Sequence, residues 1–146
     1  VCAQTIDPVE WRRVVALSRL AIASGEPTNA ASLFIGGMMR SINADRRWTA
    51  AVTFADLSQG HEGTIYKATN WQYLNLTKPE PRWEDETGKQ LSRLATKSRT
   101  AGEMTGLGYR MVGKFGKHKF AKIFDIGLAQ SLIRMGDAIR GAQVAA

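Results

Sequence analysis

The clearest pattern of apolar and polar positions lies between residues 52 and 76. It opens with Val52–Phe54, an apolar run of β-branched and aromatic residues typical of a strand. Glycine and serine residues then predict a turn, and Thr64–Asn70 follows with the pattern of a short helix. Trp71–Leu76 predicts a second strand. A strand, a short helix and a strand in such a short stretch indicate an α/β unit whose strands can lie in one sheet.

Two segments before this stretch carry weaker patterns. Residues 14–22 predict a buried strand, and an amphipathic helix over Val9–Arg19 is the alternative. A helix is predicted at 33–42, because Phe34, Met38 and Ile42 recur every four residues.

The start of the helix predicted at 33–42 is a candidate ligand site. Thr28 or Asn29 is a suitable N-cap, and the first turn carries only small residues, Ala30, Ala31 and Ser32. Backbone N–H groups and the positive end of the helix dipole can bind a phosphate there. A capping role for Ser32 is the alternative.

The chain after the central stretch divides into three parts. Residues 77–88 predict an acidic, proline-containing loop in which Trp83 is either an exposed aromatic side chain or a plug at the edge of the core. A basic segment, residues 89–122, then contains a short helix with Leu91, Leu94 and Ala95, and a last strand that begins near Lys119. Finally, Asp125 begins a predicted tail helix over 125–141, whose apolar stripe is Leu128, Leu132, Met135 and Ile139.

Length and composition narrow the class of protein. The chain has 146 residues, 44% of them hydrophobic and 23% charged, which predicts one globular α+β domain over 1–146. No apolar run approaches the ~18 residues of a membrane span, and no signal peptide is visible. Cys2 is the only cysteine, which fits a reducing cytoplasm, and His61 and His118 show no metal-ligand spacing.

The net charge of +7 and the pI of about 9.9 favour a polyanionic partner. Most of this charge falls in the basic segment, where cations alternate with aromatic side chains. A solvated cationic face is the alternative. We expect contacts to the phosphates of double-stranded DNA from Arg93, Lys97, Arg99, Lys114, Lys117, His118 and Lys119.

Specific motifs add a family resemblance. Tyr66-Lys67-Ala68-Thr69-Asn70-Trp71 resembles the end of the fourth helix in GNAT acyltransferases. The fuller pattern at 55–74, A-D…G-H-x-G-x-I-Y-x-A-x-N-W-x-Y-L, resembles the Mom family of phage DNA-modification proteins. G-K-H-K-F at 116–120 is similar to a motif near the end of Mom-like proteins. These proteins have a divergent GNAT-like fold and place a carbamoylmethyl group on adenine N6.

The resemblance implies a GNAT-like mixed sheet flanked by helices. Residues 17–22 would correspond to the fourth strand, where Leu20 and Ile22 would pair with the acyl donor. The first strands of such a sheet would then be lacking from this chain, leaving an open edge at 14–22. The helix start would hold the donor through Asn29, Ala30, Ala31 and Ser32, although N-A-A-S replaces the glycines of the GNAT coenzyme A loop.

The implied activity is transfer of an acyl- or glycyl-derived group to adenine N6 in the DNA of a phage-infected bacterial cytoplasm, which protects that DNA from restriction. The donor would be acetyl coenzyme A or another activated acyl or glycyl compound, and a homo-oligomer is one possible state. Tyr66 would supply the proton of the leaving group, since a phenol keeps its proton at neutral pH. His61 would accept a proton from the amine or orient a phosphate, and Asp56 would bind the adenine amino group, with Ser32 as a further catalytic candidate.

Each role has a structural alternative: core packing for Tyr66, a local cap for His61 and an Asx turn for Asp56. For the whole protein, one alternative is a GNAT-type acetyltransferase that acts on a protein or small-molecule amine. Another is a DNA-binding module without catalysis.

Overall fold

The computed structural model describes residue 6, residues 11–125 and residues 127–128. These residues form a mixed sheet with helices and a smaller sheet, so the predicted α+β class is confirmed. None of the helices described is long and apolar enough to cross a membrane. The elements in chain order are η2 (Trp11–Arg13), β1 (Val14–Leu17), α1 (Ala30–Ala44), β2 (Ala50–Asp56), η3 (Leu57–Gln59), α2 (Thr64–Ala68), β3 (Gln72–Leu76), β4 (Glu80–Glu84), α3 (Arg93–Thr96), α4 (Ala101–Gly106), β5 (Arg110–Phe115) and β6 (Lys117–Ile123).

The main sheet has four strands in the order β1–β2–β6–β3. β1 runs parallel to β2, whereas β6 is antiparallel to both β2 and β3. The two strands and the helix predicted within residues 52–76 are confirmed. The strand predicted at 14–22 is correct only to Leu17, because residues 18–22 have no strand pairing, and β1 forms one edge of the sheet.

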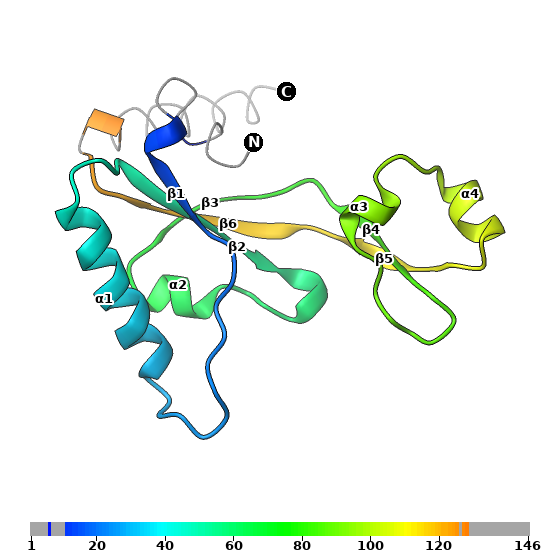
Figure 1. Ribbon diagram of the computed structural model, residues 1–146, viewed down its shortest axis with the longest axis horizontal. Coiled ribbons are helices and arrows are strands. Elements are labelled where there is room, and N and C mark those ends of the chain that lie inside the picture. Colours follow the sequence, from blue (N-terminus) through cyan, green and yellow to red (C-terminus); the bar gives the residue numbers. More distant parts are fainter. Residues whose placement is uncertain (1–5, 7–10, 126, 129–146) are drawn as a thin grey trace, which may run out of the picture.

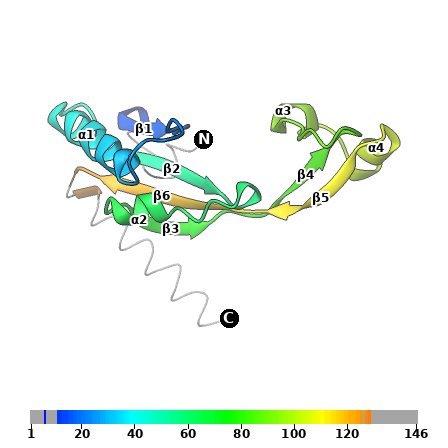
Figure 2. The same cartoon turned by 90° about the horizontal axis from the view of Figure 1, so that it is seen from below.

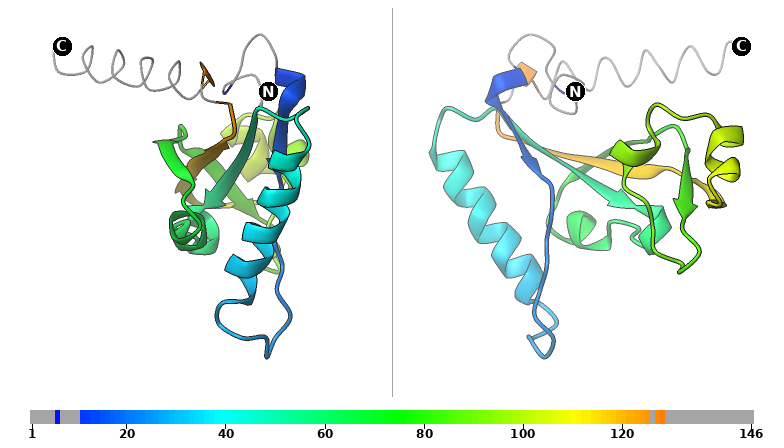
Figure 3. Two further views of the ribbon diagram at one scale, coloured as in Figure 1. Left: turned by 90° about the vertical axis from the view of Figure 1, so that its left-hand side faces the viewer. Right: turned by 45° about the vertical axis from the view of Figure 1, so that its right-hand side comes forward.

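The two longest helices in the first half of the chain, α1 and α2, lie beside the main sheet (Figure 3). They share one apolar cluster with β2 and β6, to which α1 contributes Ile35 and Met39. The predicted apolar face of α1 is therefore one position out of phase. Phe34 is 58% exposed, while Met38 and Ile42 pack at the margin of the cluster.

The opposite face of the sheet has its own apolar cluster, composed of Ile6, Val14, Ala50, Val52 and Ala121. Successive side chains of a strand point to opposite faces, so Ala51 and Ala55 belong to the helix side, whereas Val52 and Phe54 belong to this second cluster. Burial on both faces explains why β2 reads as a nearly continuous apolar run.

Gly63 fixes the turn that leads into α2. Its φ angle is +75°, and a Cβ placed there would lie 2.3 Å from the ring of Phe120. Only glycine fits this combination of left-handed backbone and close approach. The turn therefore seats α2 directly on the fully buried ring of Phe120.

The second sheet pairs β4 with β5 and, together with α3 and α4, forms a projection that we call the arm (residues 80–115). Figures 1 and 2 show the arm extending from one end of the main sheet and turning out of its plane. Trp83 and Met104 are buried in it, at 5% and 1% exposure. The capping box of Thr100 and Glu103 begins α4.

The arm corrects several predictions. Residues 77–88 are not a loop throughout, because β4 occupies Glu80–Glu84. Of the two interpretations of Trp83, burial excludes the exposed side chain and agrees with the plug, and Leu94 of the predicted short helix is 85% exposed. The last strand begins at Lys117, two residues before the predicted start, and β5 precedes it with only Gly116 between them.

The tail helix is described only at its start. The Leu128 N–H donates a hydrogen bond to Asp125 Oδ1 at 2.9 Å, as expected of an N-cap. Leu128 also packs at the margin of the second apolar cluster. The remaining predicted stripe lies outside the described residues.

Candidate functional site

Tyr66 lies on α2 with its ring in the apolar cluster between helix and sheet. Its ring centroid is 5.6 Å from that of Trp71, in an edge-on arrangement, and 5.5 Å from that of Phe120. The side chain is 9% exposed, and its hydroxyl has no hydrogen-bond partner among the residues described. The ring thus fills the seam between helix and sheet, and the hydroxyl is not committed to a structural bond there.

A row of rings continues from Tyr66 toward the surface. Tyr73 on β3 contacts Phe120 edge-on at 5.5 Å, and its hydroxyl lies 3.4 Å from Nδ1 of His118. Tyr73 is 47% exposed, so the row runs from a buried end to an open one. Sequence analysis gave Tyr73 no role, although it is the tyrosine of the W-x-Y-L that ends the pattern at 55–74.

Asp56 lies at the end of β2, where its carboxylate meets two cations. Arg82 of the arm forms an ion pair with Oδ2, and Lys117 Nζ lies 2.8 Å from the same oxygen. Oδ1 accepts hydrogen bonds from the backbone N–H and hydroxyl of Ser58, at 3.0 and 2.7 Å. The predicted Asx turn is therefore formed, and both oxygens are already engaged.

These contacts set the charge of Asp56. Burial alone would raise its pKa, but hydrogen bonds from Lys117 and Ser58 outweigh that effect and lower the pKa to about 2. The carboxylate is consequently ionised at neutral pH. Asp56 shares the face of Val52 and Phe54, so the sheet lies between it and Tyr66.

His61 lies exposed in the loop between η3 and α2. Its backbone N–H donates to the carbonyl of Asp56 at 3.2 Å, which ties this loop to the end of β2. Gly63, not His61, is the N-cap of α2. The backbone of His61 is thus held next to the end of the strand, and the residue is exposed and does not serve as the cap.

Some of the polar groups at the start of α1 already make local hydrogen bonds. Asn29 is the N-cap but makes no capping bond through its side chain. The N–H of Ala30 donates to the Pro27 carbonyl at 2.9 Å, and the Ser32 hydroxyl donates to the Asn29 carbonyl at 2.9 Å. Ala31 follows in the first helical turn. The Ser32 hydroxyl thus bonds a carbonyl of its own turn and caps no backbone N–H group among the residues described.

The predicted donor strand is not formed. Leu20 packs at the margin of the first apolar cluster, whereas Ile22 is 42% exposed, and neither lies in a strand. The expectation that an acyl donor pairs with a strand at 17–22 is therefore wrong. The strand ends at Leu17, and the chain then turns toward α1.

The cations of the basic segment fall into two groups, one exposed in the arm and one on β6 that is paired or buried. In the arm, Lys97 and Lys114 are exposed, and Arg99 donates to the Ala95 carbonyl at 3.3 Å. Arg93 begins α3. On β6, Lys117 is paired with Asp56 and Lys119 is only 7% exposed, which corrects the expectation of an open phosphate contact at Lys119. Lys122 donates to the carbonyls of Thr69 and Asn70 at the end of α2.

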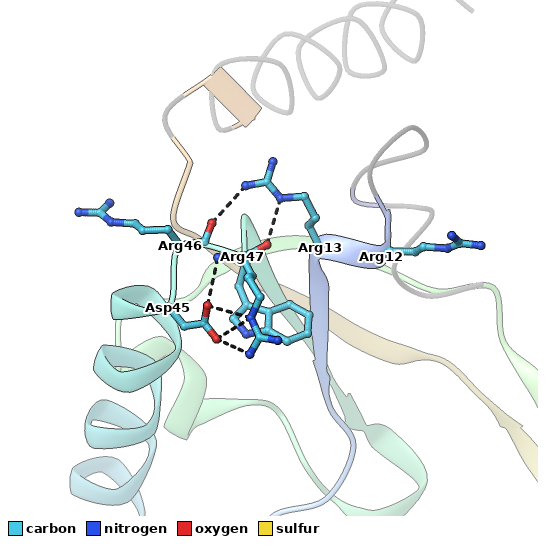
Figure 4. Close-up of a pocket in the computed structure, with 6 residues that line it drawn as sticks. Arg12, Arg13, Asp45, Arg46 and Arg47 are labelled. Atoms are coloured by element: carbon cyan, nitrogen blue, oxygen red, sulfur yellow. Dashed lines mark hydrogen bonds and ion pairs between the residues drawn. The ribbon is translucent and has the colours of Figure 1, made fainter.

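A second basic cluster lies at the opposite end of the main sheet. Its lining residues are Arg12, Arg13, Asp45, Arg46, Arg47 and Trp48, which we call the arginine corner (Figure 4). Sequence analysis missed it. The available signal was a pair of mirrored tripeptides, W-R-R at 11–13 and R-R-W at 46–48, each just before one of two neighbouring parallel strands. Parallel neighbours begin at the same edge of a sheet, so the two tripeptides meet.

The comparisons with known proteins agree with the motif at 55–74. A search of curated proteins found no match. A model of the Mom protein family matches residues 1–122, a span that includes the main sheet, both helices beside it and the arm, and the chain therefore belongs to the Mom family.

Proposed function

We propose that this chain is a DNA-modifying transferase that places an acyl- or glycyl-derived carbamoylmethyl group on adenine N6, and that the product protects the DNA from restriction. Membership of the Mom family, which is associated with modification of phage DNA, is the observation that carries the proposal. The exposed cations of the arm support double-stranded DNA as the substrate, because Lys97 and Lys114 are available to phosphates.

The reaction requires three changes at the adenine. N6 attacks the electrophilic carbon of the donor to form the N6–C bond, and the bond to the leaving group breaks with its electron pair on that group. N6 loses a proton, and the leaving group gains one. Because N6 is paired inside a duplex, the base must leave the stack before it can react.

Tyr66 is our choice for the proton that the leaving group receives. Its hydroxyl makes no hydrogen bond with any residue described, so proton donation would not break a structural contact. The exposed ring of Tyr73 and the half-buried ring of His118 continue from it along the same face, and we propose that they receive an unstacked base. His61, on the loop that leads into α2, is the candidate acceptor for the N6 proton.

The identity of the donor follows less directly. The described residues do not fit coenzyme A bound as in GNAT proteins, because residues 18–22 form no strand and the Ala30 N–H is already bonded to Pro27. We therefore assign an activated acyl or glycyl donor and no step through coenzyme A.

Mass spectrometry of nucleosides tests the proposal. DNA from cells that express the intact protein should contain adenosine with the added mass of a carbamoylmethyl group, and DNA from cells that express Tyr66→Phe should contain far less. An unmodified nucleoside profile in cells that produce folded protein would refute a DNA-modifying activity. A different added mass on adenine would retain the activity and change the transferred group.

A further inference from the structure

The arginine corner combines several positive charges with one acid. Arg47 is the partner of Asp45, with Nη2 2.5 Å and Nε 2.9 Å from Oδ2. Arg12 and Arg46 are exposed and make no ion pair with any described residue. The four arginines and single aspartate therefore leave a strongly positive surface.

Three of the four guanidinium groups of the corner, those of Arg12, Arg13 and Arg47, are held in place by neighbouring groups. Arg47 lies over the ring of Trp48 at 5.6 Å, and Arg12 lies over that of Trp11 at 5.4 Å. Arg13 donates to the backbone carbonyls of Arg47 and Arg46, at 3.0 and 3.2 Å. Such contacts reduce the conformational entropy that a long side chain loses on binding, and planar guanidinium groups suit phosphate oxygens.

The directions of the side chains distinguish an extended polyanion from a small anion. Arg12 and Arg46 point away from each other on opposite sides of the cluster (Figure 4). They do not converge on one point, as a pocket for a single phosphate would require. A row of phosphates, such as the backbone of a nucleic acid, matches cations that are spread along a surface.

We propose that the arginine corner is a second contact surface for the sugar–phosphate backbone of double-stranded DNA, distinct from the arm. This inference rests on the proposed function, because that function makes duplex DNA the substrate. The inference adds that a single duplex contacts both the arginine corner and the arm, which lie at opposite ends of the main sheet.

The separation of the two surfaces sets the length of duplex required. Thr49 joins the corner to the end of β6, since its N–H donates to the Arg13 carbonyl at 2.9 Å and its carbonyl accepts from the N–H of Phe124 at 2.8 Å. From there β6 and β5 lead back to Lys114 in the arm (Figure 1). At about 3.3 Å per residue, this path spans at most about 33 Å. One strand of B-DNA rises about 3.4 Å per nucleotide, so a duplex of about 10 base pairs bridges the corner and Lys114.

Fluorescence anisotropy with labelled duplexes of about 24 and about 8 base pairs tests the inference on the full chain. The variant is Arg12→Gln with Arg46→Gln, which keeps the side-chain stems and disturbs no ion pair of the described residues. We expect affinity for the long duplex to fall roughly tenfold or more near 0.1 M salt, and the salt slope to fall by about two. The short duplex cannot bridge both surfaces and can still bind the intact arm alone, so its affinity should fall less than that of the long duplex.

Two further variants separate the possible outcomes. Arg19→Gln with Lys67→Gln removes the same number of charges from exposed positions outside both surfaces, and should leave the slope nearly unchanged. Lys97→Gln with Lys114→Gln tests the arm. If the corner variant matches the Arg19 and Lys67 control on the long duplex while the arm variant binds weakly, the corner contact is refuted and DNA binding by the arm stands. If neither the corner nor the arm variant alters binding, the duplex substrate of the proposed function fails as well.

Discussion

Asp56 at the end of β2 forms an ion pair with Arg82 on β4, and this contact joins the main sheet to the arm. Lys117, at the start of β6, binds the same carboxylate oxygen at 2.8 Å. Three segments far apart in the sequence therefore meet at one partly buried charge. Besides the chain connections, the arm is tied to the segment that follows β2 by this ion pair and by a hydrogen bond that Gln59 Nε2 donates to Gln90 Oε1 at 3.1 Å.

Asp56→Asn should destabilise the fold by about 1–3 kcal/mol, because two cations lose their shared partner and an amide cannot replace a charged acceptor. Denaturation in urea measures the change. Asp45→Asn is the control, since Asp45 pairs with the exposed Arg47 at the surface and such pairs contribute about 0–1 kcal/mol. Equal stability of the two variants would mean that Asp56 does not hold the arm.

The lowered pKa of Asp56 predicts that the free energy of unfolding depends on pH. Its pKa in the folded protein is about 2, below the ordinary value of 3.8. A lowered pKa stabilises the fold above pH 4, and this stabilisation is lost as the pH falls from about 4 to about 2.

Between about pH 4 and about pH 2, the contribution of Asp56 to the free energy of unfolding should fall by about 1 kcal/mol. The value is modest because solvent screens this partly accessible carboxylate. It is measured as the difference between the unfolding free energies of the wild type and Asp56→Asn at pH 5 and pH 2.5. A difference that stays constant over this range would contradict the assignment. Comparison with the variant cancels the contributions of other carboxyls.

Gly63→Ala should destabilise the protein by about 2 kcal/mol or more, because the added methyl group meets the ring of Phe120 and the backbone is left-handed. Gly60 offers a matched control. Its φ angle is +69°, and a Cβ placed there has nothing within 4 Å, so Gly60→Ala should show only the backbone strain of about 1 kcal/mol. Equal effects of the two substitutions would show that the ring of Phe120 moves aside freely.

Tyr66→Phe should lower DNA modification by roughly 10²–10⁴-fold if the hydroxyl supplies the proton of the leaving group. The ring contacts with Trp71 and Phe120 remain, so stability and DNA affinity should stay near those of the wild type. Nucleoside mass spectrometry, anisotropy and thermal unfolding measure the three quantities. Tyr66→Ala would confound the test by opening a cavity.

Normal modification by the Tyr66→Phe variant would leave Tyr66 as a core residue and transfer the role to Ser32 or His61. Tyr73→Phe is a useful comparison, because it removes a hydroxyl from the same row of rings at its exposed end.

The central strands and α2 could be predicted because their signals are local. Val52–Phe54 is apolar and β-branched, and glycines mark the turn that follows. The arm could not be predicted in the same way. β4 contains Pro81 and charged residues and has little buried surface, so its sequence resembles a loop although it pairs along its length with β5.

Within the candidate site, the contacts between residues close in sequence could be predicted. The Asx turn of Asp56 involves Ser58, two residues away, whereas the ion pairs to Arg82 and Lys117 depend on how the arm folds back. The face of α1 was misplaced because Phe34 and Ile35 are both apolar, and only packing against the sheet decides which is buried.

Gly116 has a consequence for how the chain can tolerate insertions. It is the only residue between β5 and β6, and a side chain there would lie 2.8 Å from the Thr77 carbonyl. One added residue at this junction would shift β6 by one position against β2 and exchange its two faces, so that Phe120 would leave the apolar cluster. Length variation among related chains should therefore fall at the far end of the arm, between β4 and β5, where the register of the main sheet does not depend on it.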